Sequence, residues 1–151
     1  MAAFNLVGGL TALVSLLESA PLVTAGLQKV YAGSPEAFAN RVSAYVAILP
    51  GAPSPSGSGG VVSRDVRYFI GIGYRIGGAE STAETVLAAV VDAFHVAFYT
   101  TYPARDLGGV ITNGRFEDHP ERSPVYQRLA AQEFRIVPLV LVGTQSQTFS
   151  L

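Results

Sequence analysis

The clearest pattern in the chain is a strict alternation of residue types between Arg64 and Ile76. One side of this stretch is apolar throughout and consists of Val66, Tyr68, Ile70, Ile72, Tyr74 and Ile76. The other side mixes charge, one aromatic ring and glycine, and consists of Asp65, Arg67, Phe69, Gly71, Gly73 and Arg75. A period of two predicts a β-strand with one side in the core. The mixed side then needs a neighbour of a different kind.

A helix is predicted directly after this strand. Gly77 and Gly78 break the alternation, and apolar residues then recur three and four positions apart. These residues are Val86, Leu87, Val90, Val91, Phe94, Ala97 and Phe98. That spacing is typical of an amphipathic helix. Ser81 and Glu84 have the spacing of a capping box, which predicts that the helix begins there.

The remaining pattern predicts one more helix and several strands. Asn5 is the expected N-cap of a helix over residues 6–17, and Pro21 should end it. Strands are expected over residues 28–31, 43–49, 125–129 and 133–142, with a bent strand or hairpin over 107–116. Pro138 lacks a backbone N–H, so the last strand should be an edge strand or carry a bulge there. This order predicts an α+β domain with two helices packed on one side of a mainly antiparallel sheet.

The length and composition fit a single domain. The chain has 151 residues, of which 49% are hydrophobic and 14% charged, so it can bury a substantial core. Residues 50–63 are rich in Pro, Ser and Gly and predict a flexible loop between strands 43–49 and 64–76, and residues 144–151 predict a polar tail. The loop is either an idle linker or a segment that becomes ordered on a partner. We favour the second, because a hairpin needs only a few connecting residues.

Charge and residue usage exclude several classes of function. The net charge of −1 and the lack of a basic stripe argue against sequence-specific nucleic-acid binding. The absence of cysteine excludes disulfides and thiolate metal sites. Residues 6–17 are fewer than the roughly 20 needed to cross a bilayer, and the first basic residue is Lys29, so we expect a soluble, unprocessed chain without a membrane partner. Nine of the ten basic residues are arginine, which fits either an interface or a GC-rich coding sequence.

No pattern in the sequence indicates an active site. Gly71 and Gly73 lie inside a strand rather than in a turn, which argues against a dinucleotide fingerprint; they should instead let another group approach closely. His95 lies at the margin of the helix's apolar face, where a structural histidine is expected. His119 lies in the acidic loop 117–122, and a ligand-binding or enzymatic site in that loop is the alternative. We therefore predict no enzyme activity, no catalytic residue, no cofactor and no metal.

The surfaces that remain unexplained suggest self-association. Strand 43–49 is apolar on both sides, and the mixed side of strand 64–76 exposes Phe69 among arginines. An apolar surface that a small domain cannot cover indicates a shared surface; the alternative is that the N-terminal helix covers it. The candidate interface residues are Tyr45, Arg67, Phe69, Arg75, Arg115 and Arg135.

The order of these segments resembles a known family. Residues 28–35, 45–49, 67–74, 83–94, 107–110 and 133–140 are similar to the tail terminator proteins of long-tailed bacteriophages, also called tail completion or minor tail proteins. The likeness covers most of the chain and is one of pattern rather than of an invariant motif.

The resemblance implies an α+β protein that forms a homo-hexameric ring. Such rings sit on the last ring of the tail tube protein, stop tube growth and present a surface to the head-completion or stopper protein. They belong to the neck of the virion, are assembled in the host cytoplasm and carry no catalytic residue. The resemblance also implies that the 50–63 loop is an extension directed at a neighbour. Another neck component, the head–tail stopper, is the alternative within the same class.

Overall fold

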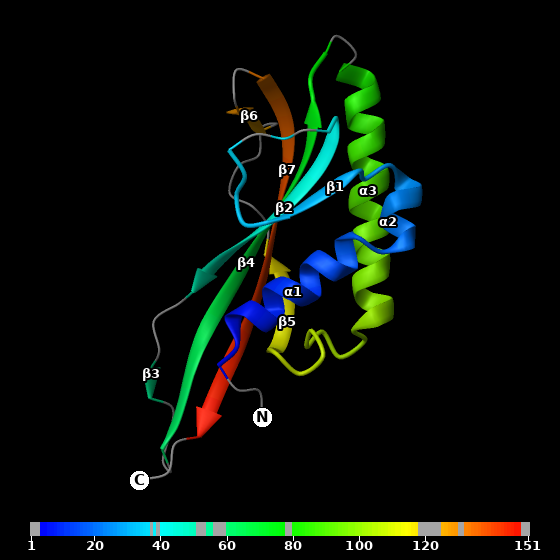
Figure 1. Cartoon of the computed structure of the whole chain (residues 1–151). Coiled ribbons are helices and arrows are strands. Elements are labelled where there is room, and N and C mark those ends of the chain that lie inside the picture. Colours follow the sequence, from blue (N-terminus) through cyan, green and yellow to red (C-terminus); the bar gives the residue numbers. More distant parts are fainter. Residues whose placement is uncertain are drawn as a thin grey trace.

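The chain folds into one mixed β-sheet with three helices on one of its faces (Figure 1). The computed structural model describes residues 4–36, 38, 40–50, 54–55, 60–77, 80–117, 125–129 and 132–148. The helices are α1 (Leu6–Leu17), α2 (Ala20–Ala25) and α3 (Glu80–Thr101). The strands are β1 (Lys29–Ala32), β2 (Val42–Pro50), β3 (Ser54–Pro55), β4 (Val61–Arg75), β5 (Thr112–Glu117), β6 (Val125–Leu129) and β7 (Gln132–Thr148). The α+β fold class predicted from the sequence is confirmed.

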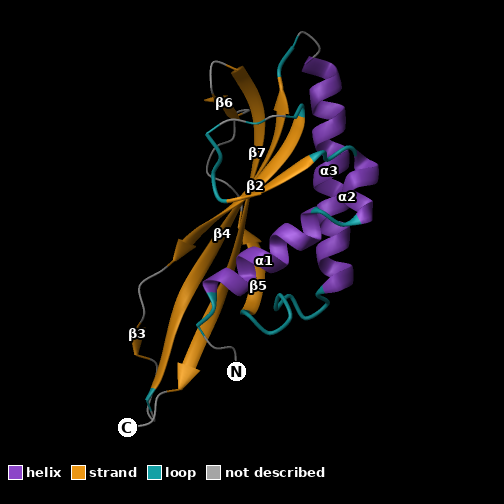
Figure 2. Cartoon of the chain, in the orientation of Figure 1, coloured by secondary structure: helices purple, strands orange, loops and turns teal. Residues whose placement is uncertain are grey.

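The sheet is antiparallel except at one end. Its strands lie in the order β1-β2-β4-β7-β5, with β3 beside β4 and β6 beside β7. The pair β1–β2 is parallel, and the other pairs of described strands are antiparallel. Figure 2 shows that the helices all lie on the same side of the strands. The opposite face of the sheet carries no helix among the described residues.

The stretch with strict alternation forms the central strand, β4. One neighbour is β2, which pairs from Val42 opposite Tyr74 to Pro50 opposite Val66. The other neighbour, β7, pairs along the whole of β4. The predicted hairpin between strands 43–49 and 64–76 is therefore confirmed. Residues 61–63 belong to β4 rather than to the loop, and residues 51–53 and 56–59 of that loop lie outside the described residues.

The apolar side of β4 packs under the helices. Val66, Tyr68, Ile70 and Ile72 are fully buried. They form one core with apolar residues of α1 and α3, which include Leu13, Leu17, Leu87, Val90, Phe94 and Phe98. The period of two along β4 and the helical period along α3 therefore meet in the same core, as the sequence pattern predicts.

The core explains the apolar composition of one side of α3. By length and composition alone, Thr82–Thr101 is apolar enough to cross a membrane, a property that core helices share. In this fold, Leu87, Val90 and Phe94 of α3 are buried in the core beneath the sheet. Burial accounts for this side of the helix, although only 33% of the apolar window is buried inside the protein.

The first helix approaches the central strand very closely at Gly9. The Asn5 side chain accepts a hydrogen bond from the Gly8 N–H at 2.9 Å, which confirms the predicted N-cap. The hydroxyl of Tyr68 donates to the Leu6 carbonyl at 3.0 Å. A Cβ atom at Gly9 would overlap that hydroxyl. Glycine is therefore required at position 9 because the ring of Tyr68 occupies the space of a side chain.

Two predictions about helix ends are wrong. Helix α3 begins at Glu80, so Ser81 lies inside it, and the Glu84 carboxylate accepts from Arg135 Nε at 2.8 Å instead of closing a capping box. Pro21 lies in the first turn of α2, a helix that the pattern did not predict, and α1 has already ended at Leu17. Proline fits a first turn because its missing N–H would have no intrahelical acceptor there. Gly26 ends α2 with a left-handed φ of 120°.

The strand β7 is longer than predicted and is not an edge strand. It runs to Thr148, so residues 144–148 continue the sheet instead of forming a polar tail; residues 149–151 lie outside the described residues. On the side away from β4, β6 pairs with residues 132–136 and β5 with residues 140–144. Pro138 lies between these two partners, where among the described strands no neighbour needs its missing N–H. The strand itself is interior, but at Pro138 it has no described neighbour on this side, as an edge strand would.

The glycine-rich segment before β5 forms turns. Leu107, Gly108 and Gly109 have positive φ values of 52°, 74° and 95°. The strand starts at Thr112 and shifts register against β7 before Arg115. Of the predicted segment 107–116, only residues 112–116 are strand, so neither predicted alternative is correct over residues 107–111. The predicted strand 125–129 is confirmed as β6.

The close contact between Gly9 and Tyr68 predicts that an alanine at position 9 destabilises the protein. In an ordinary helix, Gly→Ala stabilises by about 1 kcal/mol. Because the buried Tyr68 ring cannot move away, we expect Gly9→Ala to lower the free energy of unfolding by about 1–3 kcal/mol. Urea denaturation would measure the change, with Val7→Ala at an exposed position of α1 as the control. A more stable Gly9→Ala protein would contradict the close contact.

Candidate functional site: the open face of the sheet

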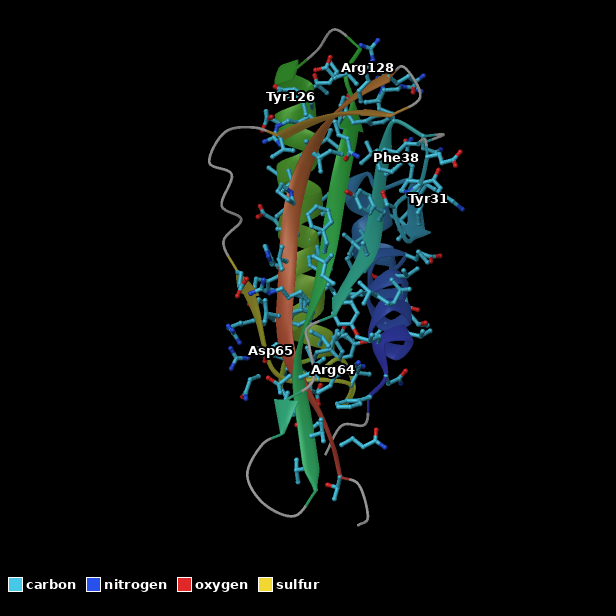
Figure 3. The ribbon with its side chains drawn as sticks, turned by 90° about the vertical axis from the view of Figure 1, so that its left-hand side faces the viewer. Tyr31, Phe38, Arg64, Asp65, Tyr126 and Arg128 are labelled. Atoms are coloured by element: carbon cyan, nitrogen blue, oxygen red, sulfur yellow. The ribbon has the colours of Figure 1, made fainter. Side chains whose placement is uncertain are left out.

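The side of the sheet away from the helices carries the mixed residues of β4. Neighbours across paired strands share a face, so the register assigns Arg67, Phe69, Gly71, Gly73 and Arg75 to this side. Figure 3 shows the sheet from this direction, with the helices behind it. The sequence left open whether the N-terminal helix covers this side. It does not, because α1 packs in the core on the other face.

An aromatic cluster covers one end of this face. Phe38, Tyr45, Phe134 and Ile136 are buried there, with Tyr31 and Phe69 packed against them. The rings of Phe38 and Phe134 meet edge to face with centroids 4.8 Å apart, and those of Tyr31 and Phe38 stack at 5.6 Å. Tyr31 and Phe38 are labelled in Figure 3. The chain therefore builds a second, smaller core on this side.

The two glycines inside β4 serve this second core. A Cβ at Gly71 would meet the ring of Tyr45, and one at Gly73 would meet Phe38 and Ile136. The predicted close approach is real, and the groups that approach belong to the same chain. No ligand is needed to explain either glycine.

Next to the aromatic cluster, a group of apolar side chains on this face is left partly exposed by the described residues. We call Ala47, Leu49, Phe69, Pro138 and Val140 the open patch. Ala47, Phe69 and Val140 lie side by side across β2, β4 and β7. Leu49 is 48% exposed, and the other four are partly exposed. A contiguous apolar surface of this kind on a sheet is typical of an interaction site.

Charged side chains border the open patch on the β5 side. Arg67 and Arg115 lie 3.6 Å and 4.0 Å from the same Glu117 carboxylate. Both arginine side chains remain more than half exposed. Exposed pairs like these add little to stability, and the exposed Asp65 lies on the same face, two residues from Arg67 along β4.

Five of the six candidate interface residues lie on the open face of the sheet, and Arg135 does not. Phe69 is in the open patch, Arg67 and Arg115 border it, and Arg75 lies on the same face near Phe134. Tyr45 is only 7% exposed because the aromatic cluster surrounds it, and burial raises the pKa of its hydroxyl. We therefore do not count Tyr45 as contact surface.

Arg135 lies on the other face of the sheet. Its register partner is Tyr74, on the helix side, and its guanidinium is ion-paired with Glu84 of α3. The assignment of Arg135 to the shared surface is therefore corrected. The sequence reasoning also missed Leu49 and Val140, although each follows from the alternation along its strand.

Beyond the open patch, residues 61–66 of β4 and 143–148 of β7 continue as a two-stranded extension, which we call the arm. The N-terminal segment holds the arm in place. Gln145 is fully buried, and its side-chain oxygen accepts from the Asn5 N–H at 3.3 Å and from Arg64 at 3.1 Å. The Arg64 guanidinium also lies 4.4 Å from the centre of the Phe4 ring. These contacts fix the arm to the start of α1. The polar residues near position 145 gave no hint of this role.

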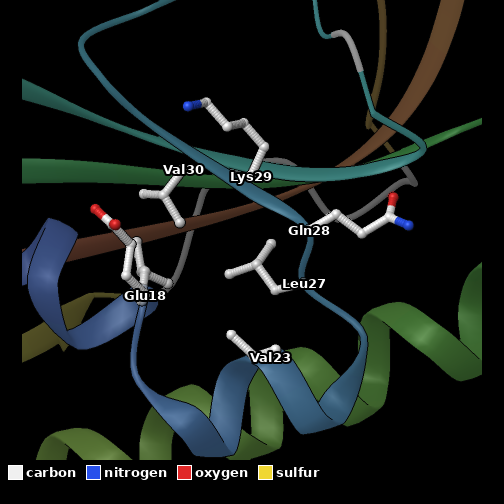
Figure 4. Close-up of a pocket in the computed structure, with 7 residues that line it drawn as sticks. Glu18, Val23, Leu27, Gln28, Lys29 and Val30 are labelled. Carbon is white, nitrogen blue, oxygen red and sulfur yellow. The ribbon is translucent and has the colours of Figure 1, made fainter.

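A small pocket lies at the β1 edge of the sheet (Figure 4). It has a volume of about 260 Å³ and is lined by Leu17, Glu18, Val23, Leu27, Gln28, Lys29 and Val30. Its ionisable groups are one carboxylate and one ammonium. The residues that line it include no histidine and no side-chain hydroxyl.

The described residues contain no group of three or more histidine, aspartate or glutamate side chains that could hold a metal ion. His119 and its neighbours in 118–124 lie outside the described residues, so the alternative site in loop 117–122 stays a prediction except at Glu117, which is ion-paired. Burial raises the pKa of Tyr68 to about 12, although the positive charge of Arg64 acts in the opposite direction. That tyrosine is a structural hydrogen-bond donor.

His95 is a structural histidine, as its position predicts. Its ring is 5.0 Å from Phe116 and 5.9 Å from Phe94, centre to centre. Burial lowers the pKa of His95, and the charge of Asp92 partly offsets that effect. The neutral imidazole is the form that fits this apolar contact.

Comparison with protein-family models and with curated proteins finds no match.

His95 makes stability depend on pH in a defined direction. Its pKa is near 6.5 in the unfolded chain and lower in the folded one. Between these two values the unfolded state binds more protons, so acid favours unfolding. We expect the stability contribution of His95 to be full above about pH 7 and to be lost as the pH falls from about 6.5 through the folded pKa.

Urea denaturation between pH 7 and 5 measures this dependence, and His95→Gln should flatten it. The chain has only two histidines, so comparison with His119→Gln shows how much of the dependence belongs to His95. An NMR titration that places the pKa of His95 above 6.5 would refute the assignment.

Proposed function

We propose that this protein is a structural component of the neck of a long-tailed bacteriophage. It forms a homo-hexameric ring that caps the tail tube and connects it to the head-completion or stopper protein. The protein acts by assembly and transforms no substrate. The observation that carries the proposal is the open patch, an apolar sheet surface that the protomer's own helices and aromatic cluster leave exposed.

The position of the open patch favours assembly over a purely internal role. A second core already covers the neighbouring half of the same face, so the chain has the means to bury aromatic rings there. Leu49 and Phe69 nevertheless remain partly exposed, and arginines border them. Arginine and apolar side chains together are typical of protein–protein interfaces, where lysine is depleted.

The arm is a second feature that supports the proposed assembly. Its strands pair from Val61 opposite Thr148 to Val66 opposite Gly143, and Figure 1 shows them projecting past the helices. A two-stranded extension fixed at its base by Gln145 and Asn5 can reach a neighbour without disturbing the core.

The proposal predicts that a charge in the open patch lowers the mass of the assembled protein. Leu49→Glu places a charge in the apolar surface and should weaken self-association at least tenfold, or about 1.4 kcal/mol. Val7→Glu makes the same replacement at a 66% exposed position of α1 and is the matched control. Size-exclusion chromatography with light scattering compares their masses with that of the parent protein, and circular dichroism confirms that both variants fold.

Electron microscopy provides the functional test. The parent protein, added to polymerising tail tube protein from the same genome, should stop elongation and appear at one tube end, and Leu49→Glu should not. Binding to the head-completion protein alone, with no effect on tubes, would favour the stopper alternative. A parent protein that stays monomeric and binds neither would refute the proposal.

A further inference from the structure

We propose that neighbouring copies join head to tail, with the outer side of α3 from one copy seated on the open patch of the next. This inference deepens the proposed function and rests on it, because it takes self-assembly as given and assigns the two surfaces that meet. The open patch and the outer side of α3 lie on opposite faces of the same protomer, so each copy offers one of each.

The outer side of α3 exposes the apolar side chains that the sheet does not bury. Val96 is 67% exposed and Tyr99 is 48% exposed. Asp92, one turn before Val96, is exposed and has no ion-pair partner among the described residues. Residues three and four apart share one side of a helix, so Asp92, Val96 and Tyr99 form a single strip.

The charges of the two surfaces are complementary. Every charged residue in α3 is acidic, namely Glu80, Glu84 and Asp92. The open patch is bordered by the exposed side chains of Arg67 and Arg115, which share the Glu117 carboxylate, and by the exposed Asp65. Contact between the strip and the patch would bury Val96 against Leu49 or Phe69 and place Asp92 near an arginine.

The two surfaces also lie at the same level of the molecule. Phe94 and Phe98 of α3 contact Phe116 of β5, with centroids 5.8 Å and 5.0 Å apart. Phe116 points to the helix side, whereas its neighbours Arg115 and Glu117 point to the open face. The strip and the border of the patch are therefore back to back across the sheet.

The proposed contact joins two different surfaces, and this restricts the symmetry of the assembly. A contact between two different surfaces is heterologous, and it closes into a ring when the rotation between copies divides a full turn. Surfaces at the same level allow that rotation without a shift along the strands. A contact of the patch with itself would stop at a two-fold dimer.

Cysteine cross-linking tests the pairing, since the chain has no native cysteine. Leu49→Cys and Val96→Cys are made separately, mixed and oxidised. We expect a disulfide between the two variants and little dimer from either one alone. Oxidation of the double variant Leu49→Cys/Val96→Cys should give a ladder of covalent multimers, because the sheet separates the two positions within one chain. Val23→Cys, at a 59% exposed position of α2, replaces Val96→Cys as the matched control and should not link to Leu49→Cys.

The other outcomes distinguish failure of the head-to-tail pairing from failure of the proposed function. If the main disulfide joins two copies of Leu49→Cys, or two copies of Val96→Cys, the head-to-tail pairing is wrong. If the parent protein caps tubes in that case, the proposed function still stands. No cross-link of any kind, with a monomeric parent that fails to cap tubes, would overturn both. A multimeric parent without the mixed link would overturn the pairing alone.

Charge reversal provides an independent measurement. Asp92→Arg should weaken self-association several-fold and reduce its sensitivity to salt, because the reversed charge repels Arg67 and Arg115. Glu18→Arg reverses an exposed acid at the end of α1 and is the control. Unchanged association of Asp92→Arg would contradict the proposed contact.

Discussion

The pairing of β4 with β7 is the constraint on which the rest of this structure depends. Their ladder runs without interruption from Val61 opposite Thr148 to Arg75 opposite Phe134. Because side chains alternate along a strand, a slip of one residue would exchange the two faces. Ile70 and Ile72 would then leave the core, and Arg67 would enter it. The register of this one pair thus determines both the buried face under the helices and the exposed face that carries the arginines.

The sequence pattern predicted the parts of the fold that depend on periodicity. The alternation along β4 and the helical spacing in α3 were read correctly because burial on one side imposes those periods. Helix α2 was missed because six residues are too few to show a period, and Pro21 was taken as an end when it is a beginning. Residues 144–148 were taken as a tail because Gln145 is polar; its burial depends on Asn5 and Arg64, which are distant in sequence.

The candidate surface was predictable in part for the same reason. Alternation placed Arg67, Phe69 and Arg75 on one side of β4, and the register confirms that they share a face. It could not show that Phe38, a loop residue, covers Tyr45, or that Arg135 turns toward Glu84. Such contacts join elements whose distance along the chain carries no local signal. They separate the part of the face that the chain covers itself from the part that it leaves exposed.

The order of the strands along the chain has a consequence for biosynthesis. Residues 61–75 leave the ribosome well before residues 132–148, yet the central strand has its second neighbour only when the latter have been made. Until then one long edge of β4 has unpaired N–H and C=O groups, and such edges promote aggregation. Sheet closure is therefore a late event, and slow translation near residue 148 would lower the yield of native protein more than slow translation near β2.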